Sequence, residues 1–111
     1  MKDNLFRAWD RDVGKYYYFS LEDLNYGRVK VTLSTCQVEQ FTGLLDKDGE
    51  KIYEGDIVKT STGNCAVVWQ PQSAAFVFGM AGWMYNHFIE EMGEVEVIGN
   101  IHEHPHLMVK R

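Results

Sequence analysis

The stretch Leu44–Val58, which reads LLDKDGEKIYEGDIV, decides the fold class because turns separate its short apolar runs. The Asp48-Gly49 step is typical of the tight turn of a β-hairpin, since glycine adopts a positive φ without a Cβ clash. Glu54-Gly55-Asp56 predicts a second turn, and Ile57-Val58 begins the next strand. Short strands joined by glycine turns indicate an antiparallel β structure.

The same pattern continues toward the C-terminus. Residues 82–92 are either a short helix or an aromatic-rich strand, and the tail from Glu103, with Pro105, is expected to leave the sheet. The other elements expected after Val58 are a turn at Thr62–Asn64, strands at Ala66–Trp69 and Ala75–Phe78, and a final half-buried strand around Val95, Val97 and Ile101.

The N-terminal part predicts a hairpin and a further strand pair. Leu5–Trp9 and Tyr16–Phe19 flank a turn and form the hairpin. Val29, Val31 and Leu33 alternate with polar residues, which predicts a strand with one wet face, and Val38–Phe41 is its expected partner. Ser20 to Gly27 is polar and loop-like, with at most one helical turn at Leu21–Leu24.

Three blocks, read in order, resemble the YopX family of small phage and prophage proteins. These are Phe6–Asp10, Gln40–Val58 and Val97–Pro105. The resemblance implies a largely β fold, a phage or prophage origin and oligomer formation. It implies no reaction and therefore no catalytic residues. The family tends to read Ile-Tyr-Glu-Asn-Pro-Glu near its end, where this chain has Ile101–His106, so its histidines are particular to this protein.

Length and composition predict one domain over residues 1–111. The chain has 111 residues, 45% of them hydrophobic, which is enough for one core and too little for two. Tyr53–Val58 is similar to the opening of SH3-like barrels. The fold class is therefore mainly β: a small barrel or sandwich with an SH3-like portion, an N-terminal hairpin and at most one or two short helices.

Charge and cysteine usage restrict the partners and the location. Eleven basic residues against sixteen acidic ones give a net charge of −5, which disfavours nucleic acid as a partner. A nucleic-acid-binding module that uses the SH3-like barrel region, with Lys47, Lys51, Lys59 and neighbouring aromatics, is nevertheless a second interpretation. The sequence has no apolar run long enough to span a membrane, and Cys36 and Cys65 form no C-x-x-C pair. We expect buried thiols and a cytoplasmic location.

The candidate sites have structural explanations. His102, His104 and His106 would share one face of a strand and could collect a metal, with His87 as a distant fourth ligand, but Pro105 interrupts that strand. The sequence contains no nucleophile elbow and no phosphate-binding glycine loop. The acidic residues fall on turns and wet strand positions. We predict no catalytic residue, no cofactor site and no metal site.

Aromatic and methionine residues exceed what one small core needs. Neighbouring residues of Tyr16–Tyr18 must point to opposite faces of a strand, so at least one ring is expected on the surface. Such surface commonly marks a protein interface. The first interpretation is a non-enzymatic module that binds proteins, itself included. Most of the other aromatics considered are expected in the core, and these are Trp69, Phe76, Phe78, Trp83 and Tyr85. The methionines considered for the surface are Met80, Met84 and Met92.

Overall fold

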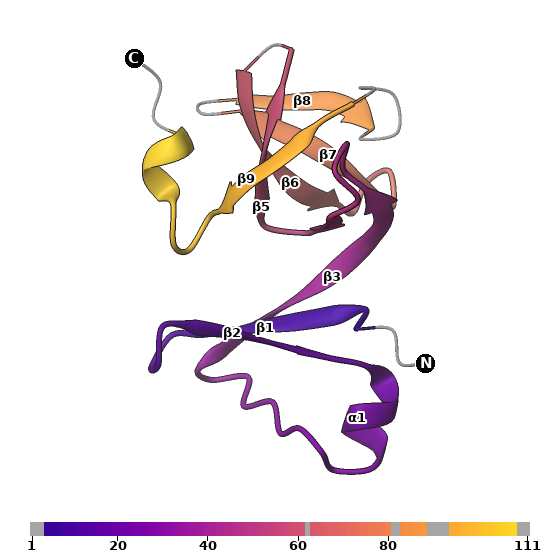
Figure 1. Ribbon diagram of the computed structural model, residues 1–111, viewed down its shortest axis with the longest axis vertical. Helices are drawn as coiled ribbons and strands as arrows, with labels where there is room; N and C mark the ends of the chain where they lie inside the picture. Colours follow the sequence, from indigo (N-terminus) through magenta and orange to yellow (C-terminus); the bar gives the residue numbers. More distant parts are fainter. Residues whose placement is uncertain (1–3, 62, 81–82, 89–93, 109–111) are drawn as a thin grey trace. The chain divides into compact units, whose positions relative to one another are not determined.

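The computed structural model describes residues 4–61, 63–80, 83–88 and 94–108, with the backbone alone at residues 80 and 83–88. The chain forms two compact units, Met1–Phe41 (unit 1) and Thr42–Arg111 (unit 2). The elements, labelled in Figure 1, are β1 Phe6–Asp10, β2 Lys15–Phe19, α1 Leu21–Asn25, β3 Cys36–Leu45, β4 Lys51–Tyr53, β5 Asp56–Thr60, β6 Gly63–Gln70, β7 Ala75–Met80, β8 Trp83–Phe88, β9 Glu96–Asn100 and the 3-10 helix η2 Pro105–Met108.

The mainly β class is confirmed. One sheet has the strand order β2-β1-β3-β4 and the other the order β8-β7-β6-β5-β9. Strand β3 begins in unit 1 and ends in unit 2. The single domain over residues 1–111 and the SH3-like portion stay predictions.

The predicted N-terminal hairpin is confirmed in unit 1. Strand β1 pairs antiparallel with β2 on one side and with β3 on the other. The turn between β1 and β2 ends at Gly14, whose φ of 72° lies in the region that favours glycine. The core of this unit consists of Ala8, Phe19 and Cys36, with Phe6, Tyr17, Val29 and Val31 packed against them.

The strand predicted at Val29–Leu33 is wrong. This segment is irregular, although Val29 and Val31 do pack against the core. The backbone N–H groups of Thr35 and Cys36 then donate to the carbonyl of Thr32 and turn the chain into β3. The alternation of apolar and polar residues here therefore reflects which side chains are buried and does not indicate strand pairing. The expected partner, Val38–Phe41, lies in β3, which pairs with β1 instead.

Unit 2 is built as its glycines and aspartates predict. The hairpin of β3 and β4 turns at Asp48-Gly49, where Gly49 has a φ of 82°. Its apolar residues and those of the five-stranded sheet form a half-barrel around one core. This core consists of Ile52, Val58, Cys65, Val67, Phe78 and Val95, with Leu44, Phe76 and Val97 packed against it.

The remaining expectations for unit 2 are largely confirmed. Strands are present at Ala66–Trp69 and Ala75–Phe78, within β6 and β7. Within 82–92, the aromatic-rich strand is confirmed over Trp83–Phe88, and the rest of that stretch lies outside the described residues. Of the turn predicted at Thr62–Asn64, Thr62 also lies outside them, whereas Gly63 and Asn64 belong to β6 and pair with β5, so the prediction is wrong for those two residues. Strand β9 ends at Asn100, one residue before Ile101, and the tail leaves the sheet as expected.

Candidate protein-binding site

Unit 1 contains an apolar hollow of about 300 Å³. Helix α1, the irregular segment before β3, and strands β1, β2 and β3 contribute its walls. All of its lining side chains are apolar. The lining residues are Phe6, Phe19, Leu21, Leu24, Val31, Leu33 and Val38, and they are called the unit 1 hollow below.

Local sequence positions the helical wall of the hollow. The Ser20 side chain accepts a hydrogen bond from the Asp23 N–H, and the Asp23 carboxylate accepts one from the Ser20 N–H. This capping box fixes the first turn of α1. Leu21 and Leu24, three residues apart, therefore share one face of the helix and line the hollow together.

Strands β1 and β2 and the irregular segment before β3 also contribute lining residues. The rings of Phe6 and Phe19, opposite each other on β1 and β2, stack with centroids 5.8 Å apart. Leu33, from the irregular segment before β3, also lines the hollow and has 76% of its surface exposed, and Leu21 is 62% exposed. The lining thus includes the buried Phe19, the half-buried Phe6 and exposed leucines.

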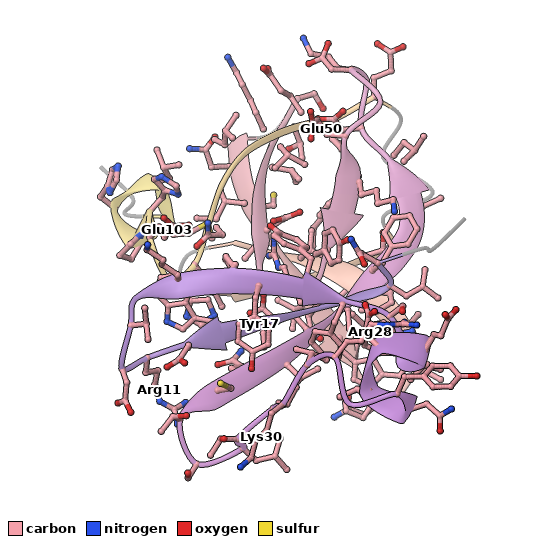
Figure 2. The ribbon with its side chains drawn as sticks, turned by 60° about the horizontal axis from the view of Figure 1, so that its bottom comes forward. Arg11, Tyr17, Arg28, Lys30, Glu50 and Glu103 are labelled. Atoms are coloured by element: carbon pink, nitrogen blue, oxygen red, sulfur yellow. The ribbon has the colours of Figure 1, made fainter. Side chains whose placement is uncertain are left out.

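Hydrogen bonds hold the irregular segment that carries Val31 and Leu33. The Tyr17 hydroxyl donates to the carbonyl of Lys30 at 3.2 Å and also contacts the sulfur of Cys36 at 3.4 Å. Burial, followed by the Cys36 contact, raises the pKa of Tyr17 to about 12. The Arg11 guanidinium donates to the carbonyl of Ser34 at 2.6 Å. Figure 2 labels Arg11, Tyr17 and Lys30 in this part of the chain.

The basic side chain that follows α1 pairs with two acidic side chains of that helix. The guanidinium of Arg28, which Figure 2 labels, lies 3.3 Å from carboxylate oxygens of both Glu22 and Asp23. The lining itself consists of apolar side chains, which transfer no proton. The chemistry of the hollow is therefore to exclude water from an apolar side chain placed in it.

The amino-acid sequence contains one signal for this hollow. Leu21, Leu24 and Leu33 are large apolar residues within polar surroundings. The residue pattern assigns the first two to a loop and the third to a strand, so their shared location was not predicted.

The described aromatic residues divide between core and surface. Tyr18 and Trp69 have 47% and 40% of their surface exposed, but Phe78 is fully buried. Tyr16 donates to the Glu39 carboxylate at 2.8 Å, and Glu39 also forms a buried ion pair with Arg7 at 2.8 Å. The side chains at Met80, Trp83, Met84, Tyr85 and Met92 lie outside the described structure.

Three histidines, His102, His104 and His106, follow strand β9, and the middle one has a structural role. His104 Nδ1 accepts a hydrogen bond from the Asn100 N–H at 3.2 Å, and its ring lies against Gly99. His106 is exposed, with its ring 6.1 Å from that of His104. Within residues 4–61, 63–80, 83–88 and 94–108, side chains that the structure places form no group of three or more potential metal ligands. The side chain of His87 is not among those described.

Two acidic residues on the turns, Asp46 and Asp56, bind backbone N–H groups. Asp46 accepts from the N–H groups of Asp48, Glu50 and Val97. Burial opposes ionisation of this carboxyl, but these hydrogen bonds outweigh burial and lower the pKa of Asp46 below its ordinary 3.8. Asp56 likewise accepts from the Tyr53 N–H at 2.8 Å.

The lysines considered for nucleic acid lie among acidic side chains. Lys47 and Lys59 line a shallow depression together with Glu94 and Glu96. The Lys47 ammonium is 3.7 Å from the Glu96 carboxylate. Both features reduce the positive potential that a phosphate backbone requires.

A known family covers nearly the whole chain, unit 1 and unit 2 alike. The YopX family, described as YopX protein, matches residues 5–109. The chain belongs to the YopX family. This YopX chain matches no curated protein. Its structure is similar to the crystal structure of protein EF1440 from Enterococcus faecalis, with 21% identity and a TM-score of 0.61 over 95% of this chain and 97% of that chain.

That structural likeness shows a shared fold. Among the described residues of the YopX chain, no helix has the length and apolar character needed to cross a membrane.

Proposed function

We propose that this YopX-family chain is a non-enzymatic phage or prophage accessory protein that binds proteins, itself included, with the unit 1 hollow. The observation that carries the proposal is the apolar hollow, whose lining includes the exposed Leu21 and Leu33. The phage or prophage origin implied by the YopX resemblance, together with two buried free thiols, supports action in the cytoplasm of a bacterial host.

The energetics of the hollow favour a protein as its occupant. Fully burying one leucine side chain stabilises a complex by about 1.5–3 kcal/mol, so a partner that covers the exposed leucines with apolar surface would bind more tightly. A small metabolite is normally oriented by a few polar groups in its pocket. The lining of the hollow offers apolar side chains instead, so apolar side chains of a protein fit its chemistry better than a metabolite does.

Structural roles of the buried carboxylates support a non-enzymatic function. Asp23 belongs to a helix cap, Asp46 and Asp56 fix turns, and Glu39 pairs with Arg7. Burial can shift the pKa of an acidic group and so suit it to acid–base catalysis. Each of these buried carboxylates, however, already accepts a hydrogen bond from a group that holds the fold together.

A pair of variants tests binding through the hollow. We expect Leu21→Asp to lower the capture of partner proteins from phage-induced cells at least about tenfold, because a carboxylate in the hollow must lose its water. Asp at the start of α1 also favours the helix, so the fold should survive. The control is Val13→Asp, which adds the same charge to an exposed turn of unit 1. Equal capture by both variants would contradict the proposal.

Nucleic-acid binding has less support, because Lys47 and Lys59 lie beside Glu94 and Glu96. A gel-shift titration at low salt distinguishes this alternative. Binding that weakens steeply with salt and disappears in Lys59→Glu would favour it over protein binding.

A further inference from the structure

We propose that His104 makes the attachment of residues 101–108 sensitive to acid: protonation of its Nδ1 releases this C-terminal segment from strands β9 and β6 while the sheet of unit 2 stays folded. The C-terminal segment follows β9 and contains the 3-10 helix η2, shown in yellow in Figure 1. It belongs to unit 2, so the proposal is independent of the unit 1 hollow.

Two hydrogen bonds between Asn100 and His104 join the segment to the end of β9. The Asn100 N–H donates to Nδ1 of the His104 ring at 3.2 Å, and the His104 N–H donates to the Asn100 carbonyl at 2.9 Å. The Asn100 side chain supports the turn between them, because its Oδ1 accepts from the N–H groups of His102 and Glu103. The ring of His104 lies against Gly99, on the side where another residue would carry its Cβ. The imidazole is therefore one of the groups that hold the turn on the sheet.

The rest of the segment has little buried surface. All of residues 101–108 are half-buried or exposed, so they contribute no side chain to the buried core. Beyond the turn, the Asn64 side chain donates to the carbonyl of Leu107 at 3.0 Å and joins η2 to β6. Segments that bury little apolar surface open locally, at a lower free energy than the whole fold. Release of residues 101–108 therefore does not require the sheet to unfold.

Protonation of His104 is incompatible with its hydrogen bond to Asn100. A neutral imidazole has one nitrogen with a proton and one with a lone pair that accepts. Because Nδ1 accepts from the Asn100 N–H, the proton of the neutral ring is on Nε2. A second proton must go to Nδ1, where two donors would then face each other. Histidine rings take up this proton between about pH 5 and pH 8, so mild acid is enough to break the contact.

The charged groups around His104 favour release of the protonated ring. The Glu103 carboxylate already accepts a hydrogen bond from the Asn100 side chain at 3.0 Å. The ring of His106 on η2 lies 6.1 Å from that of His104, so protonation of both rings adds repulsion within the attached segment. Strand β6 contributes no charged side chain. The remaining titratable groups on the adjoining strands and turns are His102, Glu54, Asp56, Lys59, Cys65 and Glu96.

The net charge of unit 2 also favours a positive charge on the released segment. Residues 42–111 contain five Lys and Arg and ten Asp and Glu, a difference of −5 that equals the net charge of the whole chain. A released imidazolium regains its water and stays tethered to this acidic unit. The attached ring keeps its hydrogen bond to Asn100 only in the neutral form.

The sign of the pH effect follows from this difference. The attached segment needs a neutral ring, whereas a released histidine takes up a proton below about pH 6.5. Attachment is therefore complete above that pH, and its equilibrium constant falls about tenfold for each pH unit below it.

Amide hydrogen exchange of the full chain, followed by NMR, tests the proposal. Protection is expressed as the ratio of the intrinsic to the measured exchange rate at each pH, which removes the pH dependence of the exchange reaction itself. In the wild type we expect the protection of the Asn100, His104 and Leu107 N–H groups to fall about tenfold from about pH 7.5 to about pH 5.5. The N–H groups of the central strand β5 should keep their protection, because the sheet stays folded.

A pair of variants assigns the effect to one ring. His104→Asn keeps an acceptor oxygen near the position of Nδ1 but takes up no proton, so its protection should change less than about twofold over the same range. The matched control is His106→Asn, which removes the exposed neighbouring histidine and should retain the tenfold loss. A loss of protection that persists in His104→Asn would overturn the proposal, as would a wild type whose protection is unchanged in acid.

A second measurement needs no variant. Nitrogen NMR of the imidazole rings should show Nδ1 of His104 without a proton at about pH 7.5, and the midpoint of its titration should coincide with the midpoint of the loss of protection. A proton on that nitrogen at neutral pH would contradict the assigned hydrogen bond. A loss of protection that followed the titration of His102 or His106 instead would also exclude His104 as the sensitive group.

Discussion

The carboxylate of Asp46 binds N–H groups of Asp48, Glu50 and Val97 at 2.8, 2.9 and 3.0 Å. It therefore joins the turn between β3 and β4 to strand β9. We expect Asp46→Ala to lower the free energy of unfolding by about 2–3 kcal/mol, because buried donors lose a charged acceptor. Urea denaturation at pH 7 measures this loss. Asp48→Ala is the control, since its exposed side chain should contribute less than about 0.5 kcal/mol.

The same residue predicts the direction of a pH effect. The pKa of Asp46 is lower in the folded chain than its ordinary 3.8, so the folded state favours the ionised form. The stabilisation is complete above that ordinary value and is lost as the pH falls through the lowered pKa. The stability difference between wild type and Asp46→Ala should therefore shrink in acid. A difference that grew as the pH fell through this range would contradict the role assigned to the ionised carboxylate.

At the scale of the element, α1 is a short helix whose start is fixed by Ser20 and Asp23. A helix this short depends on its cap, because few internal hydrogen bonds hold it. We expect Ser20→Ala to cost about 1 kcal/mol of stability and to weaken self-association as Leu21 and Leu24 lose their common orientation. Thermal denaturation and sedimentation measure the two effects. Ser34→Ala, exposed in the same unit, should change neither.

Elements also differ in how far the sequence alone predicts them. The turn at Asp48-Gly49 was predictable because glycine there has a φ that other residues resist. The strand expected at Val29–Leu33 was wrong because alternation records which side chains are covered and not which backbone pairs. The hollow needed Leu21 and Leu33 together, and they come from separate segments that only the fold brings to one site.

At the scale of the whole molecule, charge is divided unevenly along the chain. Unit 1 is neutral and unit 2 carries the −5. Association through unit 1 should therefore respond weakly to salt. We expect the dissociation constant of self-association to change less than about threefold between about 50 and about 500 mM NaCl, whereas binding to phosphate would weaken by orders of magnitude. Sedimentation at both salt concentrations measures it, and a steep dependence would place the contact on charged surface instead.

The contact between Gly99 and His104 has a consequence for how this sequence can change. A Cβ at position 99 would lie 2.8 Å from Nδ1 and 3.0 Å from the Cβ of His104. Because the Cβ of the histidine is itself involved, rotation of the side chain does not relieve the overlap. In a lineage of such chains, loss of the imidazole at position 104 would remove the two shortest contacts, so we expect that substitution to precede the gain of a side chain at position 99.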